Sequence, residues 1–214
     1  MPHPMDRVQR IFQQLERTLP RPRSGIVAQT PLEWLVATIL SAQCTDDQVN
    51  RVTPAVFERY PTAAAYAQAN CRELENLIRP VGCYTSKARN LIACGKIVSQ
   101  HYHGRVPETL EALTALPGVG RKTANVLLGN VFGKPAVIVD THVMRVAHRL
   151  GLSAGRHPTA VEFDLQRMIP RTQWTATSQR LLLHGRMVCR ARAPRCFACV
   201  VNRECPWEGK RLDD

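Results

Sequence analysis

A glycine-rich segment in the middle of the chain could bind a nucleic-acid backbone. Leu116-Pro-Gly-Val-Gly-Arg-Lys-Thr123 lies between two stretches with helical periodicity. It is not a nucleotide-binding P-loop, which needs glycine at the positions of Leu116 and Arg121. Glycines allow backbone conformations closed to other residues, and the N–H groups of the turn and the following helix N-terminus can hold a phosphate. The pattern favours a helix-hairpin-helix motif over about 107–131 rather than an ordinary helix–helix turn. The candidate DNA-contact residues here are Gly118, Gly120 and Arg121.

Lys122 stands in the first turn of the helix predicted to follow this segment. The positive end of the helix dipole and the adjacent Arg121 both disfavour a charged ammonium there. A neutral lysine amine is a nucleophile that can attack a sugar carbon. The alternative is a protonated lysine that contacts a phosphate, and the local sequence by itself favours that alternative.

Asp140 follows the apolar run Ala136–Val139 and precedes Thr141-His142. Its carboxylate can cap the next helix by accepting backbone N–H bonds, and this is the default role for the isolated residue. A carboxylate that emerges from an apolar stretch can also face positive charge developing on a ribose. The local sequence leaves both roles open.

Four of the eight cysteines crowd into one short loop with the spacing C-x6-C-x2-C-x5-C. Four thiolates so close along the chain can converge on one metal centre. Zinc sites usually take two close pairs, whereas this loop has one close pair and a wider wrap that also suits a four-iron cluster. Spacing alone leaves zinc and iron–sulfur open. The loop cysteines are Cys189, Cys196, Cys199 and Cys205, and the others, Cys44, Cys71, Cys83 and Cys94, are interpreted mainly as packing residues.

Composition and charge narrow the class of protein. The 214 residues suffice for one large or two modest domains, and a content of 44% hydrophobic and 21% charged residues argues against a disordered chain. Lysine plus arginine number 29 against 17 acids, which leaves a charge of +12 and points to a polyanionic partner. No apolar run spans a bilayer and the N-terminus lacks a signal peptide. We therefore expect a cytoplasmic protein that is not secreted, does not associate with membranes and keeps its cysteines reduced.

Helical periodicity extends along almost the whole chain. An amphipathic stretch covers 8–19, a linker follows at 19–23, and Thr30 caps a helix whose first residue is Pro31. The only run with strand character, 136–139, has no partner and is predicted to be a buried connection. About ten or eleven helices and no sheet predict an all-α fold. The other helices are predicted to begin near 46, 62, 71 and 86 and to cover about 107–115, 120–131, 140–151, 158–169 and 175–187.

Three features together resemble the endonuclease III family, DNA glycosylases with lyase activity. They are the segment Leu116–Val126, the tetrapeptide Val139-Asp-Thr-His142 and the four-cysteine loop, and the resemblance covers nearly the whole chain. It implies a two-domain helix-hairpin-helix glycosylase fold. Residues 24–134 would form a six-helix barrel, and residues 1–23 with 135–214 would form an iron–sulfur cluster domain with its cluster loop at 189–205. Lys122 and Asp140 would then face each other across a cleft.

The same resemblance implies the chemistry. The protein would be a monomeric, bifunctional base excision repair enzyme that removes oxidised pyrimidines from double-stranded DNA and acts on abasic sites. Lys122 would attack C1′ of the damaged nucleotide and form a Schiff base, while Asp140 supports departure of the base. Abstraction of a C2′ proton and β-elimination would cut the strand 3′ to the lesion. The ligands of a [4Fe–4S] cluster would be Cys189, Cys196, Cys199 and Cys205.

A base inside a duplex must be flipped out, which costs a few kcal/mol of stacking and pairing. The resemblance assigns the filling of the gap to Gln43 and the loop Val81–Tyr84, and it places His142 among the DNA-contact residues. The family commonly carries leucine where this chain has Cys83, a smaller wedge exposed before DNA arrives. This difference concerns the flipped state and the opposite-base preference, not the chemistry at Lys122.

Two other functions share part of this pattern. A glycosylase without lyase activity would lack the lysine at position 122, and a non-catalytic DNA-binding module would have no use for Asp140 across a cleft. The charge run near the cysteine loop fits DNA contact or compensation of a negatively charged cluster, with a solvated surface as the alternative. Its six arginines are Arg180, Arg186, Arg190, Arg192, Arg195 and Arg203.

Overall fold

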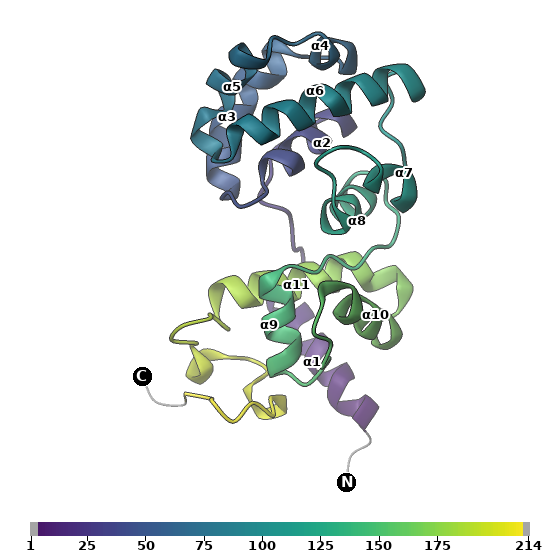
Figure 1. The fold of residues 1–214 in the computed structure, drawn as a ribbon. Coiled ribbons are helices and arrows are strands. Elements are labelled where there is room, and N and C mark those ends of the chain that lie inside the picture. The colour runs from purple at the N-terminus through teal and green to yellow at the C-terminus, as the bar shows by residue number, and fades with distance from the viewer. Residues whose placement is uncertain (1–3, 212–214) are drawn as a thin grey trace. The chain divides into compact units, whose positions relative to one another are not determined.

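The computed structural model describes residues 4–211 and separates into two compact units. One unit is Ser24–Lys134, and the other combines Met1–Arg23 with Pro135–Asp214. Residues 1–3 and 212–214 of the predicted cluster domain lie outside the described residues. The described part of the chain forms eleven α-helices and no strand, which confirms the all-α prediction (Figure 1). None of these helices has both the length and the apolar character needed to cross a membrane.

The unit 24–134 holds seven α-helices, one more than the resemblance implies. Thr62 and Thr109 each start a separate helix of five residues, because their hydroxyls accept the amides of Ala65 and Ala112 at 3.1 and 3.2 Å. The helices are α2 (Pro31–Leu40), α3 (Asp46–Arg59), α4 (Ala63–Ala67), α5 (Cys71–Ile78), α6 (Tyr84–His101), α7 (Leu110–Thr114) and α8 (Arg121–Asn130), with a short 3-10 helix, η1 (Arg79–Val81), before α6.

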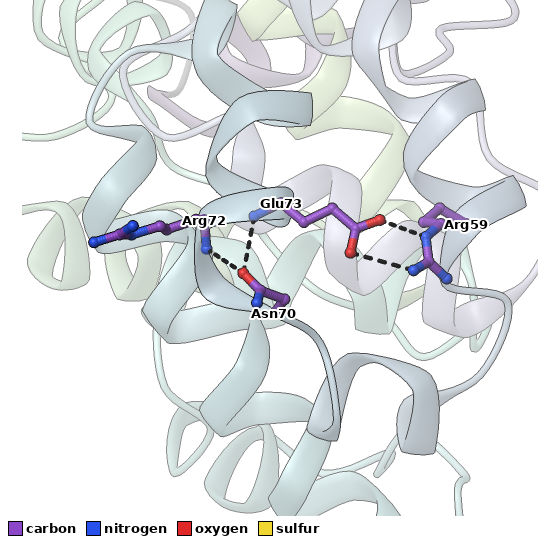
Figure 2. Close-up of polar contacts among 4 residues, drawn as sticks. All are labelled: Arg59, Asn70, Arg72 and Glu73. Atoms are coloured by element: carbon purple, nitrogen blue, oxygen red, sulfur yellow. Dashed lines mark hydrogen bonds and ion pairs between the residues drawn. The ribbon is translucent and has the colours of Figure 1, made fainter.

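Side-chain caps fix where several of these helices begin. Thr30 and Glu33 form a capping box at the predicted start of α2. Figure 2 shows the cap of α5, where Oδ1 of Asn70 accepts the amides of Arg72 and Glu73 at 3.0 and 3.2 Å. The Glu73 carboxylate also pairs with Arg59 at the end of α3, with Oε1 2.6 Å from Nε. The cap at Thr109 explains why α7 begins three residues after the predicted Pro107.

The long helix α6 contacts α2, α4 and α5 within this unit (Figure 1). Gly95 allows α4 to approach, since a Cβ there would lie 2.6 Å from Cβ of Tyr66 and 2.9 Å from the carbonyl oxygen of Ala63. The result is a closely packed core around α6. The buried side chains of this unit include Leu35, Ile39, Leu74, Leu91, Val98, Leu113 and Leu127.

The second unit is built around α9, which lies against α11 (Figure 1). The run 136–139 is extended and buried there, as predicted. Its amides at Ala136 and Ile138 donate to the hydroxyls of Thr175 and Ser178 on α11, at 3.3 and 3.1 Å. The elements are α1 (Pro4–Thr18), α9 (Thr141–Arg149), α10 (Pro158–Met168), α11 (Trp174–Met187) and the 3-10 helices η2 (Arg171–Gln173), η3 (Cys196–Ala198) and η4 (Asn202–Glu204).

Candidate functional site

The glycine-rich segment forms a tight turn between α7 and α8. The amide of Val119 donates to the carbonyl of Leu116 at 3.1 Å. Gly118 has φ +80°, which favours glycine, and a Cβ there would crowd the side chain of Asn90 at 3.1 Å. Gly120 is extended, with φ −88° and ψ 173°, so the prediction that both glycines adopt special conformations is wrong at Gly120.

Gly120 leaves the N-terminus of α8 open to solvent. It occupies the N-cap position without a side-chain cap, and a Cβ there would meet no heavy atom within 4 Å. The first turn of α8 is therefore left uncovered at this position. Helix N-terminal amides that are open in this way can bind a phosphate oxygen.

Lys122 is the second residue of α8, and its side chain is exposed. The opposite face of α8 is buried through Ala124, Leu127 and Leu128. Helical periodicity therefore fixes which face of α8 presents the amine to solvent. An exposed lysine amine beside this turn can react with a molecule that the turn holds.

Asp140 belongs to the second unit, at the point where the buried run 136–139 becomes α9. Its Oδ1 accepts the amides of His142 and Val143 at 2.8 and 2.9 Å, so the predicted N-cap is confirmed. Both cap bonds end on the same oxygen, so Oδ2 is not used by the cap. The cap fixes the carboxylate at the N-terminus of α9.

His142 lies half-buried in the first turn of α9. Its Nδ1 is 3.1 Å from Nη2 of Arg145, and the same Nη2 donates to the carbonyl of Gly185 at 2.8 Å. A Cβ at Gly185 would lie 3.0 Å from Cβ of His142, so glycine allows α11 to approach α9 closely. The contact of His142 with DNA stays a prediction.

The structure brings Gln43 and Cys83 together, although 40 positions separate them in the sequence. Sγ of Cys83 lies 4.0 Å from Oε1 of Gln43, and both residues are exposed. Their φ angles of +54° and +46° place both in the left-handed region, which is uncommon for residues other than glycine. The exposed thiol of Cys83 contrasts with Cys94, which is buried in α6 as a packing residue.

The four cysteines of the C-terminal loop line one pocket of the second unit, with Leu150, His184 and Trp207. Cys189 follows α11, Cys196 begins η3, and Cys199 and Cys205 follow η3 and η4. Burial, together with the three nearby thiols, raises the pKa of Cys199 to about 11. Gathered thiolates therefore need a positive centre to stabilise them. Within residues 4–211 no three His, Cys, Asp or Glu side chains meet the geometry for holding a single metal ion.

Arg145 and Arg149 contact the cysteine loop, and sequence reasoning missed both of them. Nη1 of Arg149 donates to Sγ of Cys189 at 3.4 Å, and Nε of Arg145 donates to the carbonyl of Cys189 at 3.0 Å. They stand four residues apart and so share one face of α9. That spacing, in a helix that starts at a candidate catalytic residue, is the signal that could have indicated them.

Arg180 corrects the interpretation of the charge run. Arg180 is only 5% exposed, and its guanidinium donates to Oε1 of Glu16 at 2.7 Å and to the carbonyl of Leu19 at 3.1 Å. Arg180 therefore connects α11 to α1 and to Leu19, the residue that follows α1. The prediction that this arginine contacts DNA or compensates a cluster is wrong, because its charge is already used inside the unit.

Known proteins resemble this chain over most of its length. Residues 36–171 match the family described as HhH-GPD superfamily base excision DNA repair protein. The chain is 48% identical over 194 residues to endonuclease III of Synechocystis sp., covering 90% of this chain and 88% of that protein. It is 38% identical over 200 residues to endonuclease III of Escherichia coli (strain K12), covering 94% and 95%. A solved structure of a trapped endonuclease III–DNA covalent intermediate, an estranged-adenine complex, superposes with a TM-score of 0.91 at 38% identity, over 96% of this chain and 97% of that one.

Proposed function

The chain belongs to the endonuclease III family of base excision DNA repair enzymes, and we propose which of its residues perform the DNA glycosylase and abasic-site lyase reactions. The nucleophile is Lys122. The observation that carries this assignment is the exposed position of Lys122 at the start of α8. Lys122 comes two residues after Gly120, the N-cap that has no side-chain cap, and the turn that contains Gly118 precedes them. A strand whose phosphate is held by this turn presents its sugar to the amine.

The reaction starts with attack of the neutral Lys122 amine on C1′ of the damaged nucleotide. The bond from C1′ to the base breaks, the base leaves with the electron pair, and it takes up a proton. The C1′–O4′ bond then breaks and opens the sugar ring, O4′ keeps the electron pair and takes a proton from the amine, and a Schiff base to C1′ results. Removal of a C2′ proton then expels the 3′ phosphate with the C3′–O electron pair, and water hydrolyses the Schiff base to regenerate Lys122. The similar solved structure is named as a trapped covalent intermediate with DNA, which is the kind of species that this route forms.

Asp140 supports departure of the base. Positive charge develops on the sugar as the bond to C1′ breaks, and an ionised carboxylate stabilises it. The cap bonds to the amides of His142 and Val143 hold the carboxylate in one orientation and use only Oδ1. The same residue therefore has a structural role through one oxygen and a catalytic role through its charge.

The proposed substrate is double-stranded DNA with an oxidised pyrimidine or an abasic site, bound by a monomer. Gln43 and Cys83 fill the gap left by the flipped nucleotide, because they are adjacent, exposed and carried on two separate loops. Arg121 and His142 contact the backbone. The cytoplasm, where chromosomal DNA and a reducing environment coincide in bacteria, is the proposed location.

The four cysteines of the loop 189–205 would hold a [4Fe–4S] cluster. All four line one pocket, and a guanidinium already donates to Cys189, so both the donor set and its charge environment fit such a group. When bound, the cluster supplies iron–thiolate bonds that cross-link the loop. Arg149 holds the loop against α9 through the carbonyls of Arg190 and Ala191, at 2.7 and 3.2 Å.

Product analysis on a denaturing gel tests the function. A duplex with one oxidised pyrimidine is compared with an undamaged duplex and with a duplex containing an abasic site. We expect base release and a cut 3′ to the lesion in the duplex with the oxidised pyrimidine, a cut without base release in the abasic duplex, and neither in the undamaged duplex. Base release that leaves the strand intact would instead indicate a glycosylase without lyase activity. Equal binding to all three duplexes without any reaction would indicate a non-catalytic module.

A further inference from the structure

Lys87 is a buried lysine that no step above uses. Its side chain is only 5% exposed, in the first turn of α6. Nζ donates to the carbonyl of Leu40 and to the carbonyl of Val81, each at 2.8 Å. One ammonium therefore bridges two segments that are about forty residues apart in the chain.

The two carbonyls belong to the ends of two helical elements. Leu40 is the last residue of α2 and Val81 is the last residue of η1. Carbonyls at a helix C-terminus lack partners within the helix and lie at the negative end of its dipole, so they are good acceptors for a cation. Lys87 thus anchors the points from which two loops depart.

Those two loops are the ones that carry Gln43 and Cys83. Gln43 follows the anchored Leu40 by three positions, and Cys83 follows the anchored Val81 by two. The backbone of Lys87 contributes as well, since its amide donates to the carbonyl of Cys83 at 3.1 Å. Lys87 therefore holds the Gln43 loop through its side chain, and the Cys83 loop through both its side chain and its backbone.

Both loop tips need such support. Gln43 and Cys83 have left-handed backbones, with φ +54° and +46°. Conformations of this kind persist in residues other than glycine only when the surrounding structure holds them. Burial lowers the pKa of Lys87, so the fold keeps the ammonium in place against a desolvation cost that an apolar side chain would avoid.

We propose that Lys87 is a positioning residue for base flipping, which sets the spacing of the Gln43 loop and the Cys83 loop so that the two side chains enter the duplex as one wedge. This rests on the proposed function in assigning the gap to Gln43 and Cys83. Lys87 acts through those two residues and does not itself touch DNA.

The variant Lys87→Met tests this, because methionine has similar length without a donor. In hydrogen–deuterium exchange, amides of residues 41–44 and 82–84 should exchange faster, while those of α9 and α11 stay unchanged. Excision from a duplex with an oxidised pyrimidine should fall about tenfold to a hundredfold, as expected when two bonds from a charged donor are lost. The rate of cleavage at an abasic site in a single strand, which needs no flipping, should change less than about threefold.

Two controls separate positioning from general loss of stability. Val98→Ala removes buried volume from the same helix without touching either loop, and it should reduce both reactions equally. In a Gln43→Ala, Cys83→Ala background, Lys87→Met should have almost no further effect on duplex excision, because the residues that it positions are gone. If Lys87→Met does not fold, Lys87→Gln, whose shorter amide reaches one carbonyl, takes its place in every assay.

An equal fall of the duplex and single-strand reactions in Lys87→Met would overturn the proposal. So would the same loss in the double-alanine background, or unchanged exchange at 41–44 and 82–84. A wild-type protein inactive on every lesion would refute the proposed function instead. The exchange measurement would still decide whether Lys87 tethers the two loops.

Discussion

The guanidinium of Arg149 joins α9 to the cysteine loop at Cys189. Nη1 lies 3.4 Å from Sγ of Cys189, and the Trp207 ring stacks on the guanidinium with 3.9 Å between the ring centroid and Cζ. An always-charged, planar donor in this position both orders the loop and offsets thiolate charge. It is one of the contacts that link the helix of the proposed carboxylate to the proposed cluster loop.

Substitution of Arg149 tests that link. Arg149→Met should weaken retention of the cluster, because it removes the bond to Cys189 and the bonds to two loop carbonyls. Visible absorbance of the purified protein, followed during incubation with a chelator, should decay faster than in wild type. Arg149→Lys keeps the positive charge but loses the planar guanidinium with its several donors, so its absorbance should decay at an intermediate rate. Identical decay in all three proteins would contradict this role.

Metal analysis tests the cluster itself. The purified wild-type protein should be brown and contain about four irons per chain. Cys199→Ser should lose most of this iron, whereas Cys94→Ser, which changes a thiol buried in α6, should retain it. A colourless protein that contains zinc would contradict the assignment.

Asp140 has two roles that different substitutions separate. Asp140→Asn keeps a good N-cap and removes the charge, so it should unfold at nearly the wild-type temperature but release bases at least about a hundredfold more slowly. Asp140→Ala should show the same fall in the rate of base release, and its free energy of unfolding should in addition fall by about 1 kcal/mol, because the helix cap is lost. Thermal unfolding and single-turnover base release measure the two effects. Wild-type base release by Asp140→Asn would reduce Asp140 to a helix cap.

Cys83 sets the size of the proposed wedge. Cys83→Leu should raise the rate of excision from the duplex and alter its dependence on the opposite base, because a larger apolar side chain fills more of the gap. Single-turnover excision is measured against each of the four opposite bases. Equal rates and equal preference in the two proteins would show that the wedge argument is wrong.

Local signals account for much of the fold. The caps at Thr30 and Asp140 are short-range features, so the starts of α2 and α9 were predicted correctly. At Gly120 the motif suggested a special backbone conformation, but the residue is an extended N-cap. The spacing of the motif indicates where a glycine is needed. It does not reveal whether the reason is a positive φ or the space that a side chain would fill.

Contacts between distant segments were the part that the sequence did not predict. Arg180 belongs to a run of surface-like charge, and only its pairing with Glu16, 164 positions earlier, shows that it is internal. The role of Lys87 depends on the carbonyls of Leu40 and Val81, which come to one point only in the folded chain. Periodicity and capping carry no information about such partners.

Reduction with sodium borohydride in the presence of damaged DNA tests the central assignment most directly, because it converts a Schiff base into a stable covalent bond. The wild-type protein should become cross-linked to a duplex with an oxidised pyrimidine or an abasic site, and Lys122→Gln should not, although it still folds and binds. Absence of any cross-link in the wild type, or a cross-link of equal yield in Lys122→Gln, would contradict Lys122 as the nucleophile.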